Sequence, residues 1–170
     1  SDVVSQEVYL EGFGYTVDIG APRLPARIFP IAIPQDCNFT HLEIIPGTPV
    51  VIDQKLDIAP RQAPKPITSS DSQILAVHQV EFDENYEKHY NLGTPFPTAL
   101  ARYVSTSRWR KYKIVDVRVT PFQYSKANEQ LVFYSDLKVV VHYEQDDNSR
   151  GTGYQPITDY SPRFENKASQ

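Results

Sequence analysis

Cysteine, methionine and tryptophan are nearly missing from this sequence of 170 residues, which has one cysteine, no methionine and one tryptophan. A single cysteine, Cys37, excludes an internal disulfide framework. No apolar run reaches the roughly 20 residues that a membrane-spanning helix requires. The net charge of −4 argues against binding to nucleic acid or to an anionic membrane surface. We therefore expect neither a nucleic-acid partner nor a membrane partner.

Helical patterning is scarce as well. The fourteen prolines outnumber the seven glycines, and proline is excluded from helix interiors and from central strands. Eleven tyrosines and eight phenylalanines suit a pleated surface, on which aromatic side chains pack well. Short strand-like segments recur at intervals of roughly 8–12 residues with turn residues between them. The sequence therefore predicts an all-β fold, an antiparallel β-sandwich that is jelly-roll-like.

Residues 99–143 carry the clearest strand patterns. Val115, Val117 and Val119 alternate with charged residues, which gives one apolar and one polar strand face. The segment 73–82 fits either a strand or a short turn of helix, and the pattern does not separate the two. The other segments are expected to be extended: strands at 7–18, 38–45 and 49–52, an edge strand or extended segment at 24–34, a proline-rich strap at 56–67 and an ordered loop at 85–97.

A polar, acidic and glycine-containing stretch follows Glu144. This change of composition predicts one β-sandwich domain over residues 1–144 and a flexible linker or tail over residues 145–170. The chain starts with Ser1 and carries no signal sequence. We therefore expect a processed or cloned fragment from which a signal peptide has been removed.

Several motifs occur in a specific order along the chain. Gly20-Ala-Pro22 is followed by Leu24-Pro25, by the proline-rich strap at 56–66, and by residues 110–124, which read R-K-Y-K-I-V-D-V-R-V-T-P-F-Q-Y. This order resembles the propeptide domain of the gingipain-type (C25) cysteine peptidases, whose matching segment reads approximately R-G-Y-x-I-x-x-V-x-V-x-P-x-Q-Y. The resemblance covers about residues 7–144.

The resemblance implies a function that acts on another polypeptide. It implies a non-catalytic prodomain that inhibits a C25-like cysteine peptidase and assists its folding by covering the active-site cleft, without any cofactor. The catalytic domain of that peptidase is expected after Gln170. A secreted, cell-surface or periplasmic location in a bacterium or archaeon is implied as well.

Propeptides of this family can place a basic side chain in the specificity pocket of the peptidase. A long cation suits a pocket with an acidic floor, because charge-assisted hydrogen bonds are stronger than neutral ones. Exposed flexible stretches are also where proteolysis concentrates. The resemblance therefore implies an inhibitory loop just before the best-matching strand and processing sites in the tail. The inhibitory loop comprises Arg108, Trp109, Arg110 and Lys111, the last where the family often has glycine, and the candidate processing residues are Arg150, Arg163 and Lys167.

Other interpretations of these segments remain open. The basic and aromatic run at 102–113 could stack on a nucleic acid, although the chain is acidic as a whole. The more ordinary interpretation is a solvated loop leading into a strand, with Trp109 packed at the edge of the core. For the whole chain, the alternative function is a cell-surface binding module of the adhesin or carbohydrate-binding type, with exposed tyrosines as the contact platform. A third is a β-domain that only supports a catalytic unit.

No catalytic or metal-binding motif is evident. Cys37 and His41 could suggest a nucleophile and a base, but in a strand they would lie ~13 Å apart at about 3.3 Å per residue. A lone cysteine in a β-domain is usually a small packed side chain. The four histidines lack metal-ligand spacing, so we expect no catalytic residues, no metal and no cofactor.

Overall fold

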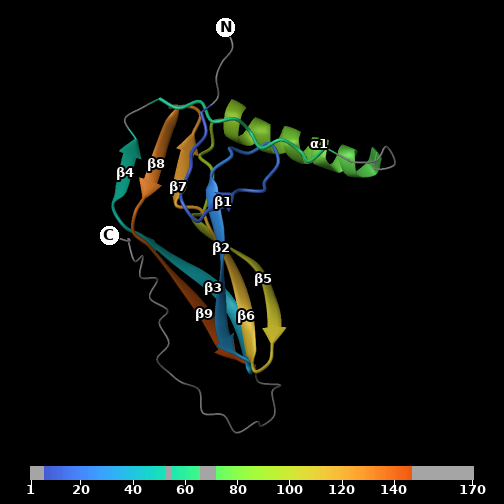
Figure 1. Cartoon of the computed structure of the whole chain (residues 1–170), viewed down its shortest axis with the longest axis vertical. Coiled ribbons are helices and arrows are strands. Elements are labelled where there is room, and N and C mark those ends of the chain that lie inside the picture. The colour runs from blue at the N-terminus through green and yellow to red at the C-terminus, as the bar shows by residue number, and fades with distance from the viewer. Residues whose placement is uncertain (1–5, 53–54, 66–71, 147–170) are drawn as a thin grey trace. The chain divides into compact units, whose positions relative to one another are not determined.

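The computed structural model describes residues 6–52, 55–65 and 72–146 (Figure 1). The chain divides into two compact units. Unit 1 holds Ser1–Arg27, Pro49–Leu100 and Thr120–Ser135, and unit 2 holds Ile28–Thr48, Ala101–Val119 and Asp136–Gln170. The described elements are β1 (Gly14–Tyr15), β2 (Pro25–Pro34), β3 (Cys37–Pro46), β4 (Pro49–Ile52), α1 (Ser72–Tyr86), the π-helical turn η1 (Glu87–Asn91), β5 (Ala101–Trp109), β6 (Tyr112–Val119), β7 (Phe122–Ser125), β8 (Gln130–Tyr134) and β9 (Leu137–Gln145).

Unit 2 is built from two layers of strands. One layer joins β2, β6 and β5 in that order, and the other pairs β3 with β9. Val115 and Val117 of β6 are fully buried, and burying each such side chain stabilises the fold by about 1.5–3 kcal/mol. The layers enclose Ile31, Ile33, Ala101, Val115, Val117 and Val139, with Phe39, Leu42, Ile44, Val119, Leu137 and Val141 packed against them.

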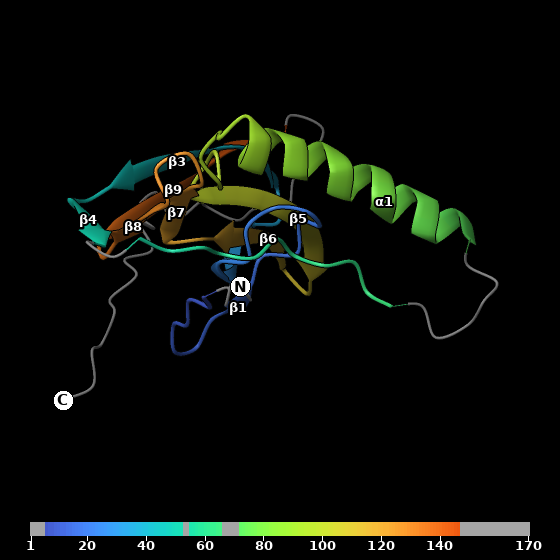
Figure 2. The same cartoon turned by 90° about the horizontal axis from the view of Figure 1, so that it is seen from above.

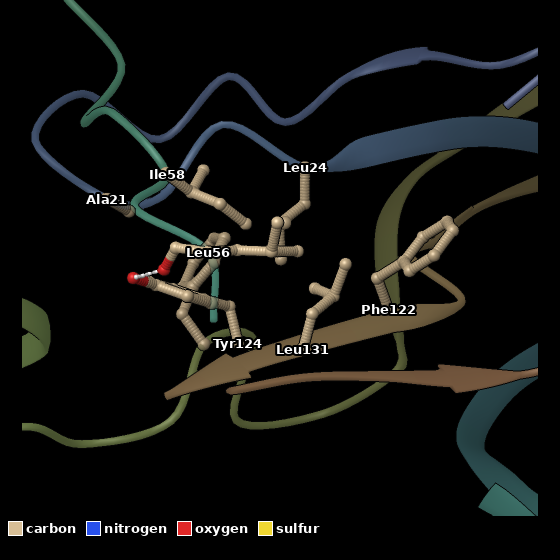
Figure 3. Close-up of a cluster of buried hydrophobic side chains, with 8 residues drawn as sticks. Ala21, Leu24, Leu56, Ile58, Phe122, Tyr124 and Leu131 are labelled. Carbon is tan, nitrogen blue, oxygen red and sulfur yellow. Dashed lines mark hydrogen bonds between the residues drawn. The ribbon is translucent and has the colours of Figure 1, made fainter. Parts of the chain in front are cut away.

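Unit 1 contains the antiparallel sheet β4–β8–β7. Leu56 and Ile58, from the proline-rich strap, are buried against this sheet in a core that also contains Tyr124 and Leu131 (Figure 3). The hydroxyl of Tyr124 donates a hydrogen bond of 2.8 Å to the carbonyl oxygen of Leu56. The strap therefore supplies core side chains and also satisfies a buried tyrosine.

The helix α1 lies in unit 1 and continues directly into η1. The rings of Phe82, Tyr86 and Tyr90 stack in succession, with centroid separations of 5.7 Å and 4.8 Å. The hydroxyl of Tyr90 donates 2.7 Å to the carbonyl oxygen of Ile58, and burial raises the pKa of this phenol. The aromatic end of the helical segment is thus tied to the strap.

The all-β, sandwich-like prediction is confirmed, and the segments differ from it in detail. The segment 73–82 is helical, which settles the open choice between strand and helix. The strand expected at 7–18 shrinks to Gly14–Tyr15, β3 pairs with β9, and β4 pairs with β8. Among the described residues, no helix is both long enough and apolar enough to span a bilayer.

Candidate functional site

The predicted inhibitory loop forms the tip of a β-hairpin in unit 2. Strands β5 and β6 pair antiparallel up to Trp109 opposite Tyr112, so only Arg110 and Lys111 form the turn. Arg110 has a φ of 56°, a conformation that glycine usually provides in two-residue hairpins. The expectation of a loop over 102–109 is wrong, because these residues belong to β5.

All four predicted residues are exposed to solvent. Trp109 exposes 63% of its surface, so the expectation that it packs at the core edge is wrong. The guanidinium of Arg110 lies 5.6 Å from the centroid of the Trp109 ring, and the ammonium of Lys111 lies 5.4 Å from that of Tyr112. Such cation–π contacts contribute about 0.5–1 kcal/mol at exposed sites. The two turn cations are therefore oriented by the aromatic pair below them.

The two candidate arginines differ in position. Arg110 lies at the apex of the turn, whereas Arg108 lies within β5, opposite Lys113 in the register. Residues directly opposite each other in an antiparallel pair project to the same face of the sheet. In the part of the chain that the structure describes, the side chain of Arg108 has no ion-pair or hydrogen-bond partner. Of the two arginines, Arg110 is the one at the extreme end of the hairpin.

Contacts to β3 support the hairpin from one side. The ammonium of Lys113 donates hydrogen bonds of 2.7 Å to the carbonyl oxygen of Cys37 and to Oδ1 of Asn38. The rings of Tyr103 and Phe39 stack with a centroid separation of 4.7 Å. Lys113 is therefore buried and holds the hairpin to β3, unlike the exposed cations of the turn. The basic and aromatic run at 102–113 did not distinguish the buried lysine from the exposed cations.

Strand β5 is the outer strand of its sheet. Its residues after Ala101 are all exposed, and Ser105 donates 2.9 Å to the carboxylate of Asp116 on the neighbouring strand. An edge strand of this kind presents backbone groups to an incoming chain, and charged side chains on it discourage pairing with a second copy. The hairpin is thus both accessible and cationic.

Cys37 and His41 do not form a catalytic pair. The thiol of Cys37 is buried and lies 3.9 Å from Asp36 Oδ1, whereas the ring of His41 stacks on His142 and contacts Thr40. Burial raises the pKa of the Cys37 thiol, and the neighbouring Asp36 adds to this effect. A thiol in this state is a poor nucleophile.

The candidate processing residues Arg150, Arg163 and Lys167 lie outside the described residues.

The apolar, exposed first half of α1 was not recognised from the sequence. The sequence signal for this helix was a dense apolar segment between two polar segments. The apolar side chains of that segment are spread around the helix, however, and give no stripe at helical spacing.

The family description Propeptide_C25 matches residues 1–159. The chain belongs to the Propeptide_C25 family. It is accordingly a propeptide domain without catalytic function, and the resemblance inferred from the motif order is confirmed. The alternative of a cell-surface binding module is not favoured by this match. No curated protein sequence is significantly similar to the chain.

Two solved structures from Porphyromonas gingivalis share the fold. One is a complex of the RgpB pro- and mature domains, with 20% identity and a TM-score of 0.52 over 78% of this chain and 64% of that chain. The other concerns the zymogenic latency of gingipain K, with 19% identity and a TM-score of 0.54 over 79% of this chain and 71% of that chain. The chain thus spans less than two thirds of the RgpB chain.

Proposed function

We propose that this domain is the N-terminal prodomain of a C25-type cysteine peptidase, that it assists the folding of the mature domain, and that it holds that domain latent by covering the active-site cleft. The observation that carries the proposal is the exposed cationic turn of the β5–β6 hairpin in a chain of the propeptide family. A hairpin that is already formed loses less conformational entropy when it enters a cleft than a disordered segment would, so its contacts contribute more fully to affinity.

Arg110 is the residue that enters the specificity pocket in this proposal. Its place at the apex of the two-residue turn allows the guanidinium to lead the hairpin into a narrow site. A carboxylate in the pocket would receive charge-assisted hydrogen bonds from it, in the bidentate geometry that arginine favours. Trp109, Lys111 and Arg108 then contact the rim of the cleft.

Inhibition in trans tests the proposal. The mature peptidase domain from the same precursor is titrated with the domain while hydrolysis of small substrates with arginine or lysine before the scissile bond is followed. Complete inhibition is expected near equimolar ratio, and full activity at large excess would overturn the proposal. Arg110→Ala should raise the inhibition constant by on the order of 10- to 100-fold, since hydrogen bonds to charged groups contribute about 1.5–3 kcal/mol.

Arg108→Ala is the matched control for the pocket residue. It removes the same charge from the same hairpin, but from a position within β5. We expect a much smaller change, because a charge at the rim of an interface contributes little to affinity. Equal effects of the two substitutions, or none from either, would reject the assignment of Arg110.

Release of the inhibitor is assigned to the tail. Cleavage at Arg150, Arg163 or Lys167 would end the covalent link to the mature domain, and with it an effective concentration that is about millimolar for short linkers. A precursor with all three residues changed to Gln should stay uncleaved and latent while the unchanged precursor matures. Normal maturation of the changed precursor would show that processing occurs elsewhere. Secretion or display at the cell surface, after removal of a signal peptide, belongs to the same proposal.

A further inference from the structure

The first half of α1 presents apolar side chains to solvent. Ile74, Leu75, Val77 and Val80 expose 52%, 43%, 65% and 57% of their surfaces. Residues 72–80 include no Asp, Glu, Lys or Arg. A helix that is apolar around its circumference is normally buried, yet these four side chains are exposed to solvent. The first half of the helix therefore has the composition of a buried helix, but its apolar side chains are exposed to solvent.

The second half of the helix is held firmly to unit 1. The carboxylate of Glu81 accepts a hydrogen bond of 3.2 Å from the amide of Ile19, and the side chain of Asn85 donates 2.8 Å to the Ile19 carbonyl oxygen. Gly20 lies so close to the helix that a Cβ there would be 2.3 Å from the carbonyl oxygen of Phe82. In both views this anchored end lies against the rest of unit 1, and the helix extends from there with its first turns pointing away from the unit 1 sheet (Figure 1, Figure 2).

An interface with a mature domain needs more surface than the hairpin turn offers. Specific protein complexes bury about 800 Å² on each partner, supplied by roughly 20–30 residues. The buried core of such an interface is more apolar than the rest of the surface, and the two turn residues Arg110 and Lys111 supply little apolar surface. The surface of α1 has the apolar character that the turn lacks, and it belongs to the other compact unit.

We propose that the first half of α1 is a docking helix whose exposed apolar side chains pack into an apolar groove on the mature peptidase domain. The inference rests on the proposed function, because it takes the mature domain as the partner. The tether of a precursor keeps that domain at high effective concentration, which favours it over a second copy. A membrane surface is a poorer fit, since interfacial helices carry lysine and arginine on their polar face.

A neutral triple substitution tests the docking helix. Ile74→Gln, Val77→Gln and Val80→Gln remove the apolar surface without adding charge, and Gln is a good helix former. The matched control carries Ile28→Gln, Ile45→Gln and Val50→Gln, which are exposed apolar positions on strands with 45%, 45% and 48% exposure. Dissociation constants for the mature domain are measured by calorimetry, after circular dichroism and urea unfolding have established that each variant folds.

If α1 is a docking helix, we expect the helix variant to bind the mature domain more weakly by on the order of 100-fold, because it loses three interface side chains. We expect the control variant to bind almost as tightly as the unchanged domain. A helix variant that binds as tightly as the unchanged domain overturns the inference and leaves the proposed function standing. An unchanged domain that does not bind the mature domain overturns both. Equal weakening in both variants also overturns it, because the effect would then not be specific to α1.

Hydrogen exchange provides a second readout. Helices of about 15 residues are marginal in water without tertiary packing, so the amides of residues 74–80 should exchange rapidly in the free domain. They should become protected in the complex. Protection in the free domain that rises with protein concentration would show a second copy as the occupant, and protection by lipid vesicles alone would show a membrane. Either result, like continued rapid exchange in the complex, overturns the assignment to the mature domain.

Discussion

The ammonium of Lys113 donates a hydrogen bond of 2.7 Å to Oδ1 of Asn38, 75 residues away in the sequence. Lys113 retains only 6% of its surface exposed, and its second bond goes to the carbonyl oxygen of Cys37. The contact joins β6, two residues after the cationic turn, to β3. It therefore fixes the strand from which Arg110 projects.

Lys113→Met should destabilise the fold. Methionine retains much of the apolar stem but leaves the buried Cys37 carbonyl without its donor, and an unsatisfied buried polar group costs about 1–3 kcal/mol. Urea unfolding should show a loss of free energy of unfolding of that size. Lys111→Met, on the exposed turn two residues earlier, should stay within about 0.5 kcal/mol. Equal stability of the two variants would contradict the anchoring role.

Gly20→Ala should be among the more damaging small substitutions. Gly20 has a φ of +83°, and a Cβ would meet the backbone of Phe82 at 2.3 Å. The left-handed conformation alone costs a non-glycine residue about 1–2 kcal/mol, and the clash requires the helix to move. Unfolding by urea, followed through the far-ultraviolet helical signal, should show a loss above 2 kcal/mol.

Gly14→Ala is the control for that substitution. Its added Cβ would have its nearest neighbour, the carbonyl oxygen of Ala26, at an ordinary 3.7 Å. We expect a change within about 1 kcal/mol. If Gly20→Ala were as well tolerated as Gly14→Ala, the close contact between Gly20 and α1 would not restrain the helix.

Local patterning accounts for what could be predicted from the sequence. The alternation of Val115, Val117 and Val119 identified the buried face of β6, and proline and turn residues marked the strand boundaries. Lys113 is in phase with those valines, so the same alternation carries the signal that it faces the interior. The two-residue turn was hidden because Arg110 takes a conformation that usually requires glycine.

Long-range pairing accounts for much of what could not be predicted. Strand β3 pairs with β9 and β4 pairs with β8, which no local pattern specifies because strand partners are chosen by tertiary packing. The helix α1 was ambiguous for a related reason. Its first half is apolar without a stripe, and amphipathic spacing is what ordinarily distinguishes a surface helix from a strand.

Cys37 should resist thiol reagents in the folded protein. Its side chain is 5% exposed, and burial raises the pKa of the thiol, so that little of the reactive thiolate is present or accessible. Reaction with an aromatic disulfide reagent near pH 8 should be slow in buffer and rapid in concentrated urea. Fast stoichiometric reaction in buffer would contradict this placement and would reopen a redox or nucleophilic role.

His89 should make the fold sensitive to mild acid. Its ring is 3% exposed, its Nδ1 lies 2.8 Å from the Thr94 carbonyl oxygen, and the Phe96 ring packs against it edge-on. Burial lowers the pKa of this imidazole in the folded state; the bond to Thr94 and the charge of Asp18 oppose the shift, and the charge of Lys88 adds to it. The unfolded chain therefore takes up a proton at a higher pH than the folded chain does.

The sign of the pH effect follows from that difference. Stability is complete above the unfolded pKa of about 6.5 and falls as the pH drops from there through the folded value. Free energies of unfolding in urea between about pH 5 and 7.5 should slope downward toward acid, and His89→Asn, which retains a donor toward Thr94, should remove that slope. Parallel curves for the two proteins would show that the acid sensitivity arises from other groups, because only the titration at residue 89 differs between them.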